Sequence, residues 1–561
     1  MVTLKNLKIG KKKLGLFISF SFLCIGVIPL LFLTYLPELN NNYTIDPLLL
    51  EAEDGVYISA YKYTPKGEKS HAGIVVGHHF LGSKLNMHPL SIELVKRGFT
   101  VINIDFRGHG ASGGYFLRSE LKLDMMAAID YLEYELPYIT EIGLVGHSLG
   151  AYIALALSQN YPNRINATVA IGAVTTEFMQ VSNFLLAAGR HDFGLTKRKI
   201  LEILRIYTGI EEVYIGELYY GDFNDGNNIK GYISPYSGHY TEVYDYAIIY
   251  QTIQWFEQAF NGEKANDIII TAIALQIFSY IALMGIIILN CVLVVYIRNY
   301  LFKSKADSPE KIISDRNRGI RIKKLILYYT FPVELFQILF FFLLSSIVLD
   351  TIAFSSTSIT LSLIIGSAIG SFLVYNFILL TTEKRYYLMD MILRIKKMCS
   401  INPLKSIIYG IIIAIISILS VAAIWHWSVQ DTLPSLRDAG NMILITISSI
   451  PFYLMREFYF RSIQDRMKAI KRYQEYMVMA GIGIFIDNFL IVLMIIVGRF
   501  HLAYLPPYAL YMLPWVIITM IQNCTVPWVY INSRNILSTT IFTCIIYSWM
   551  LVVFLPSYGF L

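Results

Sequence analysis

The sequence Ile142-Gly143-Leu144-Val145-Gly146-His147-Ser148-Leu149-Gly150 runs directly into the alanine-rich segment 151–156. The apolar residues before Gly146 predict a buried strand, and the segment after Ser148 predicts a helix. A serine on such a sharp strand-to-helix turn needs small neighbours, because the strand and the helix come close together where they cross. Gly146 and Gly150 meet that need, so the pattern predicts a turn that holds the Ser148 hydroxyl clear of a sheet. Ser148 is therefore our candidate nucleophile.

The elements around this turn alternate between strand and helix patterns. Segments with helical character are predicted at 87–97 and 118–133. Strands that are joined through helices form parallel sheets with both faces covered, so this order predicts an α/β sandwich. The strands expected up to this point are 56–63, 73–76, 100–105, 142–145 and 167–171.

Three motifs together resemble those of the α/β-hydrolase superfamily. They are the loop His78-His79-Phe80, the run Asp105-Phe106-Arg107-Gly108-His109-Gly110-Ala111-Ser112 and the turn Gly146–Gly150. The set is most similar to lipase/esterase and serine-aminopeptidase-like members, and it covers roughly residues 50–260. The resemblance implies an α/β-hydrolase domain with a mostly parallel, doubly wound sheet. It also implies that an acid and then a histidine follow the nucleophile along the chain.

Asp192 and His239 occupy the positions where the resemblance implies the acid and the base. Asp192 ends a strand-like run that begins at Phe184, and His239 follows the last strand pattern, just before a helix through Trp255. The histidine would accept the serine proton, and the carboxylate would fix its tautomer and stabilise the imidazolium. Alternatives stay open at both positions: Glu177, Asp222 and Asp225 for the acid, and His191, His147 and His71 for the base.

The backbone N–H groups of Leu149 and Phe80 are the expected donors of an oxyanion hole. The family commonly has glycine between the loop histidine and the apolar residue, whereas this chain has His79, which alters the backbone of that loop. His109 in the glycine-rich run is interpreted as structural. Only about ten residues follow the predicted strand 167–171 before the next one, which leaves no room for the helical cap that some members insert there.

The composition divides the molecule into a soluble part and a membrane part. Of 561 residues, 55% are hydrophobic and only 15% are charged, which is more apolar than an ordinary soluble protein. A basic N-terminus at 1–13 precedes an apolar run at 14–36 that is long enough to span a bilayer. A cleaved signal peptide is the alternative, but the run exceeds a usual signal core and no small-x-small cleavage site is evident. We therefore expect a transmembrane anchor followed by the hydrolase domain at 48–262.

Residues 267–561 read as a membrane domain with about eight transmembrane helices. Lys and Arg gather in every second connection, at 298–324, 384–405 and 456–472. Because cytoplasmic loops hold the excess of basic residues, the N-terminus is predicted inside and the hydrolase domain outside, in a multi-pass protein of the cell membrane. The expected spans are 268–297, 326–349, 357–381, 406–427, 441–458, 477–498, 508–530 and 536–556.

Asp487 and Asn488 lie near the middle of one expected span, where an ionisable side chain is unfavourable and a functional role is the default hypothesis. We find no metal-ligand spacing and no nucleotide-binding loop, so neither a metal nor a cofactor is expected. The net charge of +6 comes from the connections between spans and gives no reason to expect nucleic acid. All five cysteines lie in predicted spans or cytoplasmic segments, so the outward domain is expected to contain no disulfide.

The combined pattern predicts a membrane-embedded serine hydrolase that cleaves a lipid-like or acyl ester, or an amide, through Ser148, His239 and Asp192. The expected partners are the lipid bilayer and a small-molecule or lipid-like substrate. No feature of the sequence predicts the oligomeric state. One alternative is a transporter or sensor whose hydrolase-like domain binds a ligand without catalysis, and another is an acyltransferase. The order of serine, acid and histidine favours the hydrolase.

Overall fold

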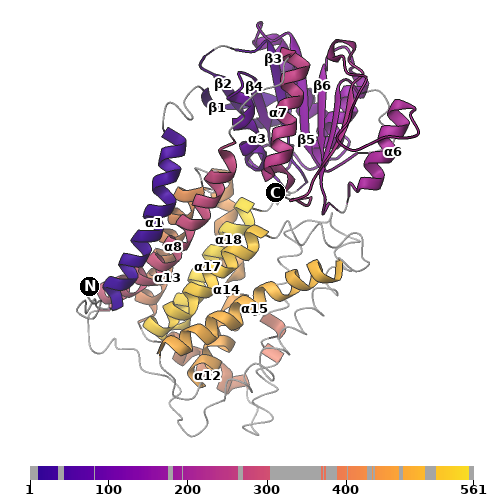
Figure 1. The fold of residues 1–561 in the computed structure, drawn as a ribbon. Helices are drawn as coiled ribbons and strands as arrows, with labels where there is room; N and C mark the ends of the chain where they lie inside the picture. The colour runs from indigo at the N-terminus through magenta and orange to yellow at the C-terminus, as the bar shows by residue number, and fades with distance from the viewer. Residues whose placement is uncertain are drawn as a thin grey trace, which may run out of the picture. The chain divides into compact units, whose positions relative to one another are not determined.

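The computed structural model describes residues 11–35, 43–302, 368–373, 388–466, 472–498 and 513–554. Within these ranges, positions 68, 81, 175–180, 193, 240, 263–269, 371, 401, 426–432 and 434–435 are not described. The chain divides into two compact units, one mainly of residues 25–280 and the other mainly of 281–423 and 432–555. The first contains a nine-stranded sheet with its helices, and the second contains long helices (Figure 1).

The strands of the first unit are β1 (Tyr43–Glu51), β2 (Tyr57–Pro65), β3 (Ala72–Gly77), β4 (Thr100–Ile104), β5 (Glu141–His147), β6 (Ala167–Ile171), β7 (Phe184–Gly189), β8 (Leu218–Tyr219) and β9 (Ile229–Ser234). They form one sheet in the order β1-β2-β4-β3-β5-β6-β7-β9-β8. The strands from β4 to β9 in this order are parallel, and β1, β2 and β8 pair antiparallel at the two edges. The prediction of a mostly parallel sheet is confirmed. Because the strands at both edges pair antiparallel, the whole sheet is mixed.

The helices of this unit are α3 (His88–Val95), α4 (Leu121–Glu135), α5 (Leu149–Asn160), α6 (Lys197–Thr208) and α7 (Tyr246–Asn261), with short 3₁₀ helices η2 (Lys84–Met87), η3 (Phe223–Asp225) and η4 (Glu242–Tyr244). Ile74 and Val76 of β3 belong to a core shared with α3 and α7, whereas Val75 belongs to a core shared with α4 and α5. Successive side chains of a strand point to opposite faces, so this apolar run requires helices on both faces of the sheet.

The parallel strands bring their carboxyl ends to one edge of the sheet. Gly77 at the end of β3 pairs with Gly146 near the end of β5. Gly189 at the end of β7 pairs with Ser234 at the end of β9. The loops that follow these strands therefore meet at one edge, which is where doubly wound sheets place their ligand sites.

The connection between β6 and β7 is short, as the sequence shows, but residues 175–180 within it lie outside the described part of the chain. The absence of a helical cap at that point stays a prediction. The connection between β7 and β9 carries α6, β8 and η3.

The second unit contains α8 (Ala272–Leu301), α12 (Leu388–Cys399), α13 (Pro403–Trp425), α14 (Leu436–Arg466), α15 (Arg472–Gly498), α17 (Leu513–Ser533) and α18 (Ile536–Phe554), and α1 (Lys11–Tyr35) begins the described chain. Among described residues, three helical stretches are long and apolar enough to cross a membrane: Ile277–Leu301, Pro403–Ile424 and Ile536–Val553. A shorter apolar stretch, Leu16–Phe32, lies within the predicted anchor.

By length and composition alone these apolar helices could cross a membrane. The membrane location, the number of spans and the outward orientation of the hydrolase-like unit stay predictions. The predicted spans at 441–458, 477–498 and 508–530 fall largely on α14, α15 and α17. The predicted span at 326–349 lies outside the described residues, and so does nearly all of the one at 357–381. All five cysteines are free thiols.

Candidate active site

Ser148 stands on the tight turn between β5 and α5, with φ 53° and ψ −107°. A non-glycine residue rarely adopts positive φ, and such strain persists only where the surrounding structure holds it. The Ser148 N–H donates to the carbonyl of Ile171 at 2.8 Å, which fixes the turn to β6. A Cβ at Gly146 would lie 2.1 Å from the carbonyl carbon of Gly150, so a side chain there would push the strand and the helix apart.

Three side chains from separate loops form a hydrogen-bonded chain at this turn. His239 Nε2 lies 2.9 Å from Ser148 Oγ, and His239 Nδ1 lies 3.1 Å from Asp192 Oδ2. The tautomer that fits both contacts donates from Nδ1 to the carboxylate and accepts the serine hydroxyl at Nε2. The three residues follow β5, β7 and β9, whose carboxyl ends meet at one edge of the sheet. The structure therefore brings together the candidate nucleophile, acid and base.

Asp192 is held in a turn directly after β7. Its Oδ1 accepts the N–H groups of Gly194 at 2.5 Å and Leu195 at 3.0 Å, which leaves Oδ2 for His239. Burial would raise the pKa of Asp192, but the hydrogen bond and the positive charge of His239, with further hydrogen bonds, outweigh burial and lower that pKa. Asp192 is accordingly ionised at neutral pH.

The alternative acids and bases lie elsewhere or are engaged differently. Asp222 caps η3 and accepts the N–H of Asn224, and His71 pairs with Glu141 at the exposed start of β3. His191 is exposed beside Asp192, and its backbone N–H donates to the Ser237 carbonyl at 3.0 Å. Asp225 lies in η3, and Glu177 lies outside the described residues.

The loop that carries Phe80 packs against the nucleophile turn. The N–H of Gly150 donates to the carbonyl of His78 at 3.1 Å, which ties the loop after β3 to the start of α5. Leu149 is the first residue of α5, and the N–H groups in a first helical turn have no acceptor within their own helix. The two predicted oxyanion donors thus come from adjoining segments, and their role stays a prediction.

The glycine-rich run after β4 supports this loop. The Asp105 carboxylate accepts Lys84 Nζ at 2.5 Å and the Ala111 N–H at 2.9 Å. His109 is fully buried, its Nδ1 lies 3.1 Å from the Arg107 carbonyl, and its ring packs edge-on to Phe80. Burial lowers the pKa of His109 to about 3, so it is neutral. These contacts are those of a structural histidine.

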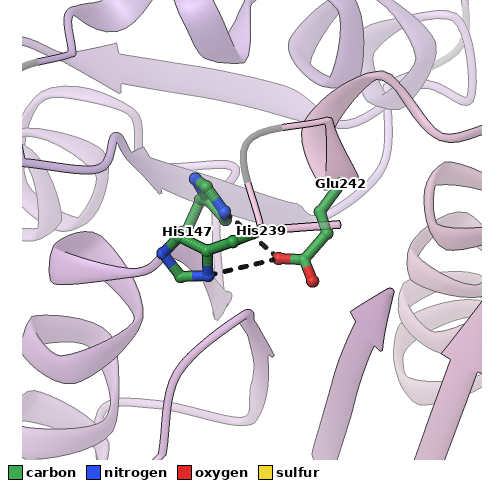
Figure 2. A group of neighbouring side chains, drawn as sticks. All are labelled: His147, His239 and Glu242. Carbon is green, nitrogen blue, oxygen red and sulfur yellow. Dashed lines mark hydrogen bonds and ion pairs between the residues drawn. The ribbon is translucent and has the colours of Figure 1, made fainter. Parts of the chain in front are cut away.

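Glu242 is a site residue that the sequence analysis does not identify. It begins η4, three residues after His239, and is fully buried. Its Oε1 accepts the Gly189 N–H at 2.6 Å, and its Oε2 lies 3.2 Å from His147 Nε2 and 4.0 Å from His239 Nδ1 (Figure 2). Burial, and then the negative charge of Asp192, raise the pKa of Glu242 well above its ordinary value.

His147, His239 and Glu242 also form a group whose ligand atoms all lie within 4.8 Å of one another. Two imidazoles and a carboxylate are a donor set that zinc accepts. Both nitrogens of His239, however, are already hydrogen-bonded, to Ser148 and Asp192, and His147 Nε2 lies within hydrogen-bond distance of Glu242. The contacts of this group therefore describe a hydrogen-bonded network.

Asp487 and Asn488 lie buried among the helices of the second unit. Asp487 Oδ1 pairs with Arg456 Nη2 at 2.5 Å, and its Oδ2 accepts Asn523 Nδ2 at 2.6 Å and the Tyr547 hydroxyl at 3.2 Å. Asn488 Oδ1 accepts the Thr519 hydroxyl at 3.0 Å. The carboxylate therefore links α14, α15, α17 and α18, and a functional role for it stays a prediction.

Arg456 is one of the basic residues that the sequence analysis assigns to a cytoplasmic connection, and that assignment stays a prediction. It lies inside α14 and is buried, as is Arg461 one turn further on. Arg461 pairs with Glu457 at 3.0 Å. Each arginine is thus neutralised by a carboxylate of the same unit, which is what a buried charge requires.

The profile of the alpha/beta hydrolase fold family matches residues 74–198, which include β3, the glycine-rich run, the turn at Ser148 and Asp192. The first unit has the α/β-hydrolase fold. The chain is 26% identical over 188 residues to the alpha/beta hydrolase domain-containing protein WAV2 of Arabidopsis thaliana, covering 31% of this chain and 60% of that protein. It is 29% identical over 121 residues to a monoacylglycerol lipase of Mycolicibacterium smegmatis, covering 21% and 43%.

Among solved structures, the esterase Pf2001 of Pyrococcus furiosus is 17% identical, with a TM-score of 0.33. The likeness covers 40% of this chain and 96% of that esterase. The chain spans less than two thirds of the length of the two relatives compared by sequence.

Proposed function

We propose that this chain is a membrane-embedded serine hydrolase that cleaves an acyl ester, with a lipid-like substrate as the preferred class. The observation that carries the proposal is the continuous hydrogen-bonded chain from Ser148 Oγ through His239 to Asp192. The strained turn at Ser148 supports it, because strained backbone that the surrounding structure holds in place is concentrated at functional sites.

In the proposed reaction, Ser148 Oγ attacks the substrate carbonyl while His239 Nε2 takes the hydroxyl proton. The ionised Asp192 holds the Nδ1–H tautomer and stabilises the imidazolium that forms. The N–H groups of Leu149 and Phe80 would stabilise the oxyanion. Collapse of the tetrahedral intermediate breaks the ester C–O bond, and His239 returns the proton to the leaving alcohol. Water, deprotonated by His239, then attacks the acyl-enzyme and releases the acid and the free serine.

The preference for a lipid-like ester rests on two supports. The connection from α7 to α8 is about ten residues, which even fully extended reaches only about 35 Å. If α8 spans a bilayer, the hydrolase unit must then work near lipid. The second support is the likeness to a monoacylglycerol lipase.

The test is covalent labelling of the full chain, purified in detergent, by a fluorophosphonate probe. Wild type, Ser148→Ala and His239→Ala are compared, with Ser158→Ala as the matched control. Ser158 lies on the same helix α5, is buried and bonds Thr168 at 2.9 Å. We expect wild type and Ser158→Ala to label and the other two variants to remain unlabelled. A folded wild-type protein that does not label would contradict the proposal and favour the ligand-binding transporter or sensor.

Labelling alone does not separate hydrolysis from transfer. Product analysis of an acyl ester, with water alone and with an added alcohol acceptor, makes that distinction. Release of free acid in both mixtures supports the hydrolase, whereas a new ester as the main product would favour the acyltransferase.

A further inference from the structure

We infer that Glu242 is a positioning residue of the proposed active site, which holds the Asp192–His239 pair in place by joining the backbone of β7 to the imidazole of His147. This inference rests on the proposed function and adds a fourth side chain to it. The partners that the structure describes for Glu242 are Gly189, His147 and His239, so we expect its effect to pass through these neighbours.

The contacts of Glu242 reach the strand ends that carry the three proposed catalytic residues. Gly189, whose N–H binds Oε1 at 2.6 Å, is the last residue of β7 and begins the turn that contains Asp192. His147, 3.2 Å from Oε2, is the last residue of β5 and directly precedes Ser148. Glu242 lies on the same loop as His239, three residues after it. Its carboxyl group thus connects this loop to the ends of β7 and β5, which Asp192 and Ser148 follow.

Gly172 shows that the fold leaves room for this carboxyl group. The residue directly follows β6 with φ +70°, and a Cβ there would lie 2.3 Å from Glu242 Oε2. The same Cβ would lie 3.1 Å from His239 Nδ1 and 3.2 Å from His147 Nε2. Any other residue at position 172 would therefore displace Glu242, which is an observation independent of the hydrogen bonds.

The charges around Glu242 define how it acts. It faces Asp192 on the loop after β7, His147 at the end of β5, His239 on the loop after β9 and Asp245 at the start of α7. Burial lowers the pKa of His147 to about 3, so this imidazole is neutral, and the pKa of Glu242 is raised by burial and by Asp192. A neutral Glu242 can donate its O–H to Asp192 and accept the His147 Nε2–H.

In this arrangement Asp192 keeps its negative charge and receives hydrogen bonds from both sides. Ionisation of Glu242, once the pH passes its raised pKa, would remove one of them and place a second negative charge 4.0 Å from His239 Nδ1, in competition with Asp192. The activity of the wild-type protein should therefore decline where Glu242 loses its proton.

The experiment measures kcat and KM of the full chain with a p-nitrophenyl ester of a short acyl chain between pH 5 and pH 10. The variants are Glu242→Gln, which keeps the shape and the neutral charge, and Glu242→Ala, which removes the contacts. Glu93→Gln is the matched control, because Glu93 is an equally buried carboxyl group on α3 that bonds Lys96 and Thr271.

We expect Glu242→Ala to lower kcat by roughly 10- to 100-fold with KM within about twofold, as removal of an orienting partner does in other sites. Glu242→Gln should keep kcat within about threefold at neutral pH and should not show the decline of wild type that accompanies ionisation of Glu242. Glu93→Gln should follow the wild-type profile.

Two outcomes would overturn the inference while leaving the proposed function intact. One is a kcat of Glu242→Ala equal to that of Glu93→Gln. The other is an equal loss in both Glu242 variants with wild-type pH profiles, which would assign Glu242 to packing alone. A wild-type protein that neither labels nor hydrolyses the ester would instead contradict the proposed function itself.

Discussion

Substitution of Gly172 by alanine introduces two unfavourable effects that glycine avoids at this position. The first is backbone strain, because an L-residue at φ +70° costs about 1–2 kcal/mol. The second is displacement of Glu242: ordinary contact begins at 3.4 Å, so its carboxyl oxygen, 2.3 Å from the new Cβ, must withdraw by about 1 Å. The displaced oxygen is Oε2, so that movement breaks its hydrogen bond with His147 Nε2 and leaves a buried donor unpaired, for a further loss of about 1–3 kcal/mol.

Gly209 provides the control for backbone strain alone. It caps α6 with φ +69°, and a Cβ there would meet nothing within 4 Å. Gly209→Ala should therefore be destabilised by about 1–2 kcal/mol and Gly172→Ala by about 2–5 kcal/mol. In a unit of this size, each kcal/mol lowers the thermal midpoint by about 2–4 °C.

The decisive assay is ester hydrolysis, because displacement of an orienting group by about 1 Å can lower a rate by about 100-fold. Gly172→Ala should therefore lose far more kcat than Gly209→Ala. In the double variant Gly172→Ala with Glu242→Ala the clash with Glu242 is gone, and the closer contacts of the new Cβ with His239 Nδ1 at 3.1 Å and His147 Nε2 at 3.2 Å remain. The loss that passes through Glu242 is then already present, so the second change should add little to the first. A Gly172→Ala protein with the kcat of Gly209→Ala would refute the reasoning, and so would fully additive losses in the double variant.

Three further predictions follow from contacts of the same structure. The folded state keeps a proton on Glu242 that the unfolded chain releases above about pH 4.3, so the free energy of unfolding should fall as pH rises towards the raised pKa of Glu242. Between pH 5 and pH 8 the thermal midpoint of Glu242→Gln should therefore fall less than that of wild type. Midpoints of the two proteins that fall in parallel with pH would contradict this. Asp192→Asn should lower kcat by about 10³–10⁴-fold, because it favours the wrong tautomer of His239, and should leave KM unchanged. Steady-state kinetics of ester hydrolysis measure both values. A loss of kcat below tenfold would indicate that Glu242 serves as the acid instead. Asp487→Ala should destabilise the second unit by about 3–5 kcal/mol, because it removes the 2.5 Å partner of the buried Arg456 guanidinium and leaves only Glu457, at 3.9 Å. Thermal denaturation in detergent checks the last prediction, and a midpoint equal to that of wild type would be incompatible with it.

The parts of the fold that could be predicted are those with a local signal. The runs at β3, β4 and β5 are apolar because both faces of the sheet are covered, and that requirement is visible in consecutive residues. The turn at Ser148 was predictable for the same reason, since the small residues it needs are its neighbours in the chain. The proximity of the loops that carry Ser148, His239 and Asp192 could also be predicted. The alternation of strands and helices predicts parallel strands, and parallel strands end at the same edge of the sheet.

The edges of the sheet were less accessible to prediction. The structure extends the α/β unit back to Tyr43 through β1, which pairs with β2 along its whole length. β1 carries Asp46 and Pro47 and is largely exposed, so it shows neither an apolar run nor a clean alternation. Proline is tolerated there because an edge strand has one side without ladder partners. β8, with only two residues, is too short to show any period.

The role of Glu242 could not be predicted from the sequence, because its partners come together only in the folded chain. In the sequence it lies shortly before α7, where an acidic residue usually means no more than a favourable charge at a helix start. Its contacts with Gly189 and His147 depend on the order of β5, β6, β7 and β9, and the space it occupies depends on a glycine at position 172. No spacing within one segment encodes that combination.

Asp487 presents the opposite case, in which a clear local signal changes meaning once its partner is known. Read alone, a carboxylate within an apolar span indicates function. The structure pairs it with Arg456, and this arginine was counted among the basic residues of a cytoplasmic connection. Burial of Arg456 and Arg461 in α14 is compatible with either side of a membrane, so the predicted orientation stays a prediction. A buried ion pair is also weak evidence of function, because pairing alone explains why both charges are tolerated. The joint substitution Arg456→Met and Asp487→Leu removes both charges without leaving either one unpaired. A loss of ester hydrolysis in this double variant, at unchanged thermal stability, would show that the pair has a functional role.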